Sequence, residues 1–110
     1  MKVTVKDGVN KYLQDNYQDF IDDIILADGF EEAFIGVSES YGLKPRACYD
    51  SSKCLDILCD RDGMQLEEAM EYFNFNVVGA YVGEFTPAFI YLFDKEYDCV
   101  SVLEHELEKE

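Results

Sequence analysis

Apolar residues in the first quarter of the chain recur at the spacing of an amphipathic helix. Asp28-Gly29 follows this stretch, and glycine commonly ends a helix because it adopts positive φ without steric cost. The pattern predicts a helix over residues 8–27 with one face turned to a core. The apolar positions are Leu13, Tyr17, Phe20, Ile21, Ile24 and Ile25.

The next segment has the pattern of a β-hairpin. Residues 33–39 form a short run rich in β-formers, and Tyr41-Gly42-Leu43-Lys44-Pro45 has the composition of a turn. Residues 46–49 then read as a second strand. We therefore predict two antiparallel strands joined by this turn.

Two further helices are predicted in the middle of the chain. Asp50-Ser51-Ser52 offers N-cap residues for a helix that Asp62-Gly63 would end. Residues 64–73 carry the second helical pattern, with glutamates on the water-facing side. The inward positions of this second helix are Leu66, Ala69, Met70 and Phe73.

The last third of the chain is less uniform in its pattern. Residues 76–83 are almost continuously apolar, which leaves a buried helix end, a strand, or one followed by the other all open. Residues 87–93 predict a strand ending at Asp94, and residues 99–108 leave a short strand and a short helix both open.

These elements predict an α+β fold in a single domain, residues 1–110. We expect an N-terminal helix at about 8–27, an α+β core at about 31–94 and a C-terminal segment at 95–110. The predicted architecture is a small, mostly antiparallel sheet of three to four strands with two to three helices packed on one face. With 48% hydrophobic residues, a chain of this length can bury a core.

The net charge of the chain limits the classes of partner that it can bind. Acidic residues outnumber basic ones 24 to 9, giving a formal net charge of −15. Such a surface repels nucleic acid and anionic membranes, so we expect neither to be bound directly. A basic protein is the expected partner, although plain solvation would also explain the acidity. No apolar run is long enough to span a bilayer, and a cytoplasmic location in a bacterial host is expected.

No motif for catalysis, a metal or a cofactor is present. Cys54 and Cys59 are five positions apart, and the single imidazole that could complete a zinc site with them, His105, lies near the end of the chain. We therefore predict no catalytic residue, no metal and no cofactor. The four cysteines are interpreted as small hydrophobic residues.

The most suggestive charged feature is a set of aspartates within the predicted first helix. Their i, i+4, i+7, i+8 spacing would place them on one face, where a fixed row of carboxylates could substitute for nucleic-acid phosphates. Glu31 and Glu32 would extend this surface. The four aspartates are Asp15, Asp19, Asp22 and Asp23.

A second candidate site lies near the predicted last strand. Gly79 and Gly83 match no phosphate-binding loop. If a small ligand binds here, we expect Tyr81, Glu84 and Thr86 to line its pocket. This alternative would make the chain a ligand-binding or enzymatic domain, and a structural dimerisation module is a third alternative.

The segment from about Glu32 to Ile90 resembles a group of short phage and bacterial proteins of unassigned function. The matching features are the Tyr49-Asp50 strand end, the Arg61-Asp62-Gly63-Met64 turn, Glu67-Glu68-Ala69, and above all Phe75 to Glu84 followed by Thr86-Pro87. This resemblance implies a phage or prophage setting and transfers no residue role. Together with the charge, it leads to the hypothesis of a phage-type protein–protein interaction inhibitor. Such a protein, of the anti-CRISPR or anti-defence class, would block a basic nucleic-acid-binding groove by charge mimicry.

Overall fold

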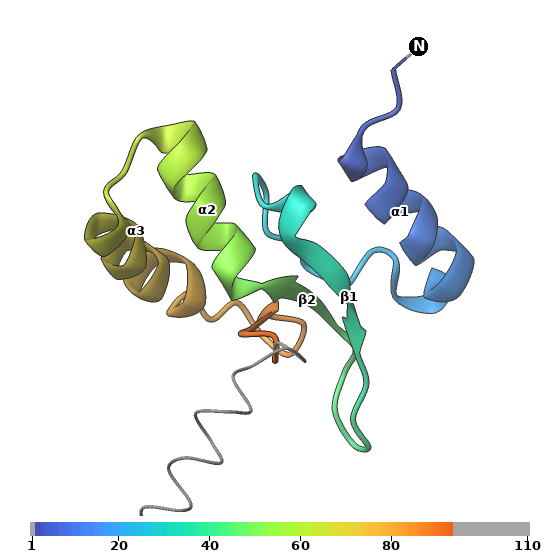
Figure 1. Ribbon diagram of the computed structural model, residues 1–110. Coiled ribbons are helices and arrows are strands. Elements are labelled where there is room, and N and C mark those ends of the chain that lie inside the picture. The colour runs from blue at the N-terminus through green and yellow to red at the C-terminus, as the bar shows by residue number, and fades with distance from the viewer. Residues whose placement is uncertain (1, 94–110) are drawn as a thin grey trace, which may run out of the picture.

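The computed structural model describes residues 2–93, and its strands form one mixed three-stranded sheet in the order β1-β2-β3 (Figure 1). Strand β1 (Phe34–Ser38) pairs antiparallel with β2 (Arg46–Asp50), as the hairpin pattern predicted. Strand β3 (Ala88–Ile90) pairs parallel with β2, because the chain returns through two helices before reaching it. The α+β class is confirmed, and the sheet is mixed.

The first helix, α1 (Val5–Asn16), is shorter than predicted and starts earlier. A capping box fixes its start: Thr4 Oγ1 accepts a hydrogen bond from Asp7 N at 3.2 Å, and Asp7 Oδ2 accepts one from Thr4 N at 3.0 Å. Tyr17, at φ −134° and ψ 42°, ends the helix.

The predicted continuation of this helix to residue 27 is wrong. A single 3₁₀ turn, η1 (Gln18–Phe20), and irregular chain replace it. Aspartate and asparagine have poor helix propensity, and they recur from residue 15 to residue 23. The last turn of α1 also lacks a basic residue to interact with its carbonyl groups. The apolar residues of this segment nevertheless belong to the core: Ile24 is buried in it, and Phe20 packs against it.

Helix α2 (Ser51–Asp62) forms as predicted. Asp50 Oδ1 accepts a hydrogen bond from Lys53 N at 3.2 Å, so Asp50 is the N-cap. Gly63 ends the helix with φ at +69°, a conformation that glycine adopts without strain.

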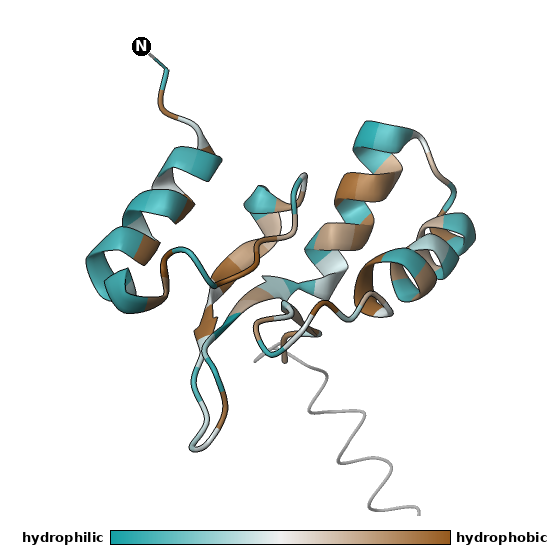
Figure 2. Cartoon of the chain, turned by 180° about the vertical axis from the view of Figure 1, so that it is seen from behind, coloured by the Kyte–Doolittle hydropathy of each residue, from teal (hydrophilic) through white to brown (hydrophobic). Residues whose placement is uncertain are grey.

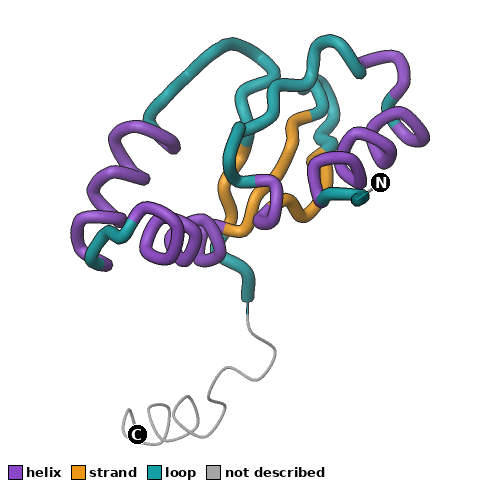
Figure 3. Tube along the Cα trace, turned by 90° about the horizontal axis from the view of Figure 1, so that it is seen from above, coloured by secondary structure: helices purple, strands orange, loops and turns teal. Residues whose placement is uncertain are grey.

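Part of the segment with the ambiguous pattern, residues 76–83, continues the helix before it. Helix α3 (Leu66–Tyr72) passes directly into a π-helix, η3 (Phe73–Val78), and the two form one run of helical coils (Figure 3). Of the alternatives for residues 76–83, a helix end is confirmed up to Val78, but its predicted burial is wrong, since Asn76 and Val78 are exposed and Val77 is half-buried. No strand follows before β3 among residues 2–93.

The predicted strand over residues 87–93 is present only as the three residues of β3. Predictions for residues 94–110, including those for Cys99 and His105, lie outside the described residues.

One hydrophobic core joins the helices to the sheet. Tyr49 at its centre is 1% exposed and lies 5.7 Å from the rings of both Phe34 and Phe89, and Phe89 in turn contacts Phe73 of η3 at 5.3 Å. Tyr49 Oη also accepts a hydrogen bond from Ala27 N at 2.8 Å, which ties the irregular chain after α1 to β2.

The distribution of polarity follows this core. In Figure 2, brown hydrophobic positions lie along β1 and alternate with teal hydrophilic ones in α2, whereas α1 is mostly teal. Within residues 2–93, no helix is both long and apolar enough to cross a membrane.

Candidate functional site

The four aspartates of the predicted row do not share a helix. Asp15 lies in α1, Asp19 in the 3₁₀ turn η1, and Asp22 and Asp23 in the turn after it. All four are exposed, and both carboxylate oxygens of Asp15 accept hydrogen bonds from Lys11 Nζ at 2.9 Å. The continuous helical face on which the row depended is therefore wrong, and a role for these residues in binding a partner stays a prediction.

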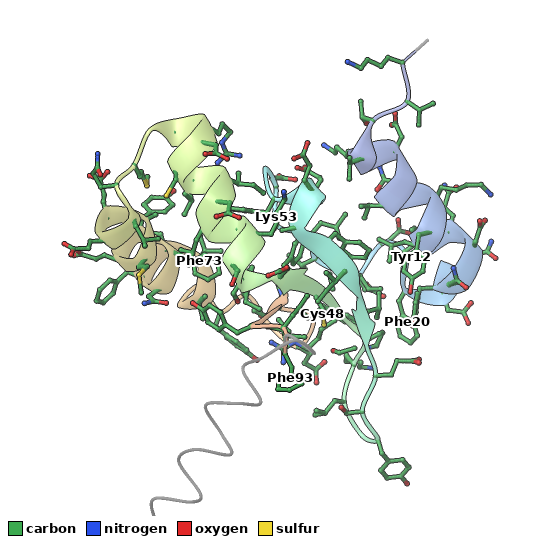
Figure 4. All side chains as sticks on the ribbon, in the orientation of Figure 1. Tyr12, Phe20, Cys48, Lys53, Phe73 and Phe93 are labelled. Carbon is green, nitrogen blue, oxygen red and sulfur yellow. The ribbon has the colours of Figure 1, made fainter. Side chains whose placement is uncertain are left out.

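Glu31 and Glu32, in contrast, belong to a built feature. They lie in the 3₁₀ turn η2 (Glu31–Ala33), opposite Asp56 and Asp60 of α2. These side chains line a hollow of about 400 Å³, which we call the acidic cleft. Its other lining residues include Lys53, which Figure 4 labels beside the start of η2.

The side of the cleft formed by Arg61 is fixed by internal contacts. Arg61 Nη1 donates a hydrogen bond to Gly29 O at 2.7 Å, and Nε and Nη2 each donate one to the carboxylate of Asp62 at 3.0 Å. Its guanidinium carbon lies 5.6 Å from the centre of the Phe30 ring. The hydrogen bonds of Arg61 thus go to groups other than the cleft carboxylates, although Glu31 still attracts its charge electrostatically.

None of the four cleft carboxylates forms an ion pair among residues 2–93, although Lys53 and Arg61 also line the cleft and Glu31 Oε1 accepts a hydrogen bond from Gly29 N at 3.2 Å. The described residues contain two ion pairs, Lys11–Asp15 and Arg61–Asp62, and neither involves the cleft carboxylates. Asp56 and Asp60 are one helical turn apart, so their carboxylates lie on the same side of α2. Such a concave anionic surface can receive a protruding lysine or arginine side chain.

Two cleft residues were missed from the sequence. Asp56 and Asp60 occupy the face of α2 opposite the buried residues Cys54 and Leu58. Their i, i+4 spacing was a readable signal of a shared face. Their nearness to η2, however, depends on tertiary packing.

The second predicted site is brought together only in part. Tyr81 and Glu84 line a hollow of about 250 Å³ with Lys44 and Arg46. Thr86 does not line it: this residue is 7% exposed, and its hydroxyl donates to Gly83 O at 2.7 Å.

The same hydroxyl of Thr86 also accepts a hydrogen bond from Val82 N at 2.9 Å. Arg46 donates to the carbonyl oxygens of Thr86 and Pro87. These bonds shape the loop before β3, so Thr86 has a structural role. The hollow is also smaller than most small-molecule sites, which begin at about 300 Å³.

The described cysteines behave as core residues. Cys48 and Cys54 are buried and Cys59 is half-buried, and all three are free thiols. Burial, with a smaller contribution from Asp50, raises the pKa of the Cys54 thiol to about 12. A thiol with so high a pKa stays protonated and is a poor nucleophile at neutral pH.

No group of three or more His, Cys, Asp and Glu side chains within residues 2–93 is arranged to hold a metal ion. The carboxylates exposed on the described surface can accept hydrogen bonds and bind positively charged groups. The acidic cleft is the place where carboxylates from two separate elements converge on one hollow. No protein-family model, curated protein or solved structure matches this chain.

Proposed function

We propose that this chain is an inhibitor that binds the basic groove of a nucleic-acid-binding protein, with the acidic cleft as its main contact. The observation that carries the proposal is the convergence of four carboxylates, two from η2 and two from α2, on one hollow, where they outnumber the two lining cations Lys53 and Arg61 and form no ion pair with them. The net charge of −15 supports it, because a strongly anionic surface attracts a basic groove at long range. The phage anti-defence class, which rests on the resemblance, is part of this proposal.

Mimicry of nucleic-acid phosphates requires carboxylates that are held in fixed positions. Asp56 and Asp60 are carried by a regular helix, and η2 packs beside that helix. A rigid arrangement binds better than a flexible one because less conformational freedom is lost on binding. Charge mimicry by these fixed carboxylates does not require a long acidic helix, and none is present among residues 2–93.

The test is competition with DNA. The tagged full chain is incubated with a bacterial lysate at about 0.1 M salt, where the Debye length is about 10 Å, and the retained proteins are challenged with excess duplex DNA. We expect nucleic-acid-binding proteins to be released by the DNA. If the retained proteins are not nucleic-acid binders, or if excess DNA leaves them bound, charge mimicry is wrong.

Two variants of equal charge locate the contact. One neutralises the cleft through Glu31→Gln, Glu32→Gln, Asp56→Asn and Asp60→Asn. The control neutralises the aspartates outside it through Asp15→Asn, Asp19→Asn, Asp22→Asn and Asp23→Asn. We expect the cleft variant to retain much less of the partner than the control. Equal losses would show that net charge, and not the cleft, governs binding.

A further inference from the structure

The helical run α3–η3 has an exposed face with an unusual composition. Residues 68, 71, 72, 75 and 76 follow the i, i+3, i+4, i+7, i+8 spacing that marks one side of a helix. An adjoining side of the run faces the core, where Ala69 is fully buried and Phe73 is 1% exposed. We call the exposed side the aromatic–acidic face, and its members are Glu68, Glu71, Tyr72, Phe75 and Asn76.

Both aromatic rings of this face are open to solvent. Phe75 is 77% exposed and Tyr72 is 42% exposed. Neither forms a ring-to-ring contact with another aromatic residue among residues 2–93, in contrast to the packed rings of the core. Exposed apolar groups that gather in one region of a protein surface commonly mark an interaction site.

The five side chains line a hollow of about 450 Å³, and no lysine or arginine lines it. Carboxylates and aromatic rings therefore meet in one place without an internal cation. The π-helix η3 begins inside this face, between Tyr72 and Phe75, and π-helical turns occur frequently at functional sites.

We infer that the aromatic–acidic face docks an arginine-rich segment of the basic partner, an inference that rests on the proposed function. A guanidinium group can donate two parallel hydrogen bonds to one carboxylate, and its flat surface can stack on an aromatic ring. Glu68 and Glu71 supply the carboxylates, while Tyr72 and Phe75 supply the rings.

Lysine fits this face less well. Its ammonium group is a compact, strongly hydrated point charge without a planar surface, so it gains little from the rings at an exposed site. The face should therefore distinguish arginine from lysine, whereas a purely electrostatic surface would not.

The experiment compares fluorescently labelled nona-arginine and nona-lysine peptides, which carry equal charge, by fluorescence anisotropy with the full chain. At about 0.15 M salt, we expect the arginine peptide to bind about tenfold more tightly, a difference of about 1.4 kcal/mol. Phe75→Leu, and separately the double change Glu68→Gln with Glu71→Gln, should remove most of this preference.

Two matched controls change the same chemistry elsewhere. Tyr41→Leu removes an exposed ring in the turn between β1 and β2, and Glu67→Gln removes a carboxylate from α3 that does not line the hollow. Both should leave the preference for arginine intact. Because all these side chains are exposed, the thermal melting temperature of each variant should stay close to that of the parent chain.

The outcomes separate this inference from the proposed function. Equal binding of both peptides, or equal effects of Glu67→Gln and Phe75→Leu on the preference, would overturn the arginine-docking face. The proposed function would survive that result if the four-residue cleft variant weakened binding of both peptides. Failure of the parent chain to bind either peptide would overturn both.

Discussion

Tyr49 combines ring packing and a hydrogen bond in the core. Its ring touches two neighbouring rings, and its hydroxyl accepts the hydrogen bond of Ala27 N at 2.8 Å. Tyr49→Phe would keep the ring and leave this amide without its partner. We expect a loss of about 1–2 kcal/mol in the free energy of unfolding, measured by urea denaturation. Tyr41→Phe, at a fully exposed position, is the control and should change stability little.

Burial also makes the fold sensitive to alkali. Burial raises the pKa of Tyr49 from 10.0 to about 12 and that of Cys54 from 9.0 to about 12. Both groups lose their protons more readily in the unfolded chain, so unfolding is favoured once the pH exceeds the lower, unfolded values. Stability should be intact below about pH 9 and should fall as the pH rises from 9 to 12.

The measurement is the urea midpoint as a function of pH. Tyr49→Phe removes one of the two titrating groups, so its stability should fall less steeply between pH 10 and 12 than that of the parent chain. An unchanged slope in this variant would show that the Tyr49 phenol titrates alike in the folded and unfolded chains.

Local signals predicted the elements whose ends are set by a few neighbouring residues. The N-cap at Asp50, the end at Gly63 and the β1–β2 hairpin all appear as expected. The predicted bounds of α1 are wrong because apolar spacing alone does not reflect the weak helix formers after Leu13 or the capping box at Thr4 and Asp7. The parallel pairing of β3 is set by long-range packing, which no local pattern encodes.

For the candidate site, too, the sequence predicts the local features but not the tertiary contacts. Glu31 and Glu32 stand out as adjacent acids, and the outward glutamates of α3 were expected to face water. The partners of Glu31 and Glu32, Asp56 and Asp60, lie more than 20 residues away along the chain, so only the fold reveals the cleft. The exposure of Phe75 was equally hidden, because an apolar residue near a helix end is normally assigned to the core.

The same substitution, glycine to alanine, should have opposite effects at two positions, one at the end of α2 and one inside α1. Gly63 has φ at +69°, so Gly63→Ala would force a side chain into a left-handed conformation and should cost about 1 kcal/mol. Gly8 lies within α1, and a Cβ added there would meet nothing within 4 Å. Gly8→Ala should therefore stabilise the protein by about 0.5–1 kcal/mol.

Thermal unfolding of the two single variants beside the parent chain measures both effects. A stabilising Gly63→Ala would contradict the left-handed end of α2. A destabilising Gly8→Ala would show that Gly8 is needed for a purpose other than forming α1.

For the molecule as a whole, a net charge of −15 costs stability. Like charges repel in the compact state more than in the expanded chain, and salt screens that repulsion. We expect the thermal melting temperature to rise between about 0.05 and 0.5 M sodium chloride, as the Debye length falls to a few Å.

The cleft variant tests whether the carboxylates serve the fold or a partner. Asp56 and Asp60 repel each other at i, i+4, a spacing at which like charges cost about 0.2–0.5 kcal/mol per pair. Neutralising all four cleft residues should therefore raise the melting temperature at low salt, and the difference from the parent chain should shrink as salt is added.

Carboxylates that weaken the fold require a reason outside it, since stability is commonly sacrificed at functional sites. A cleft variant with a higher melting temperature and weaker binding to its partner would show directly that stability is given up for binding. A variant that melts lower at low salt would instead mean that the four carboxylates support the packing of η2 on α2, and the acidity of the cleft would then be structural.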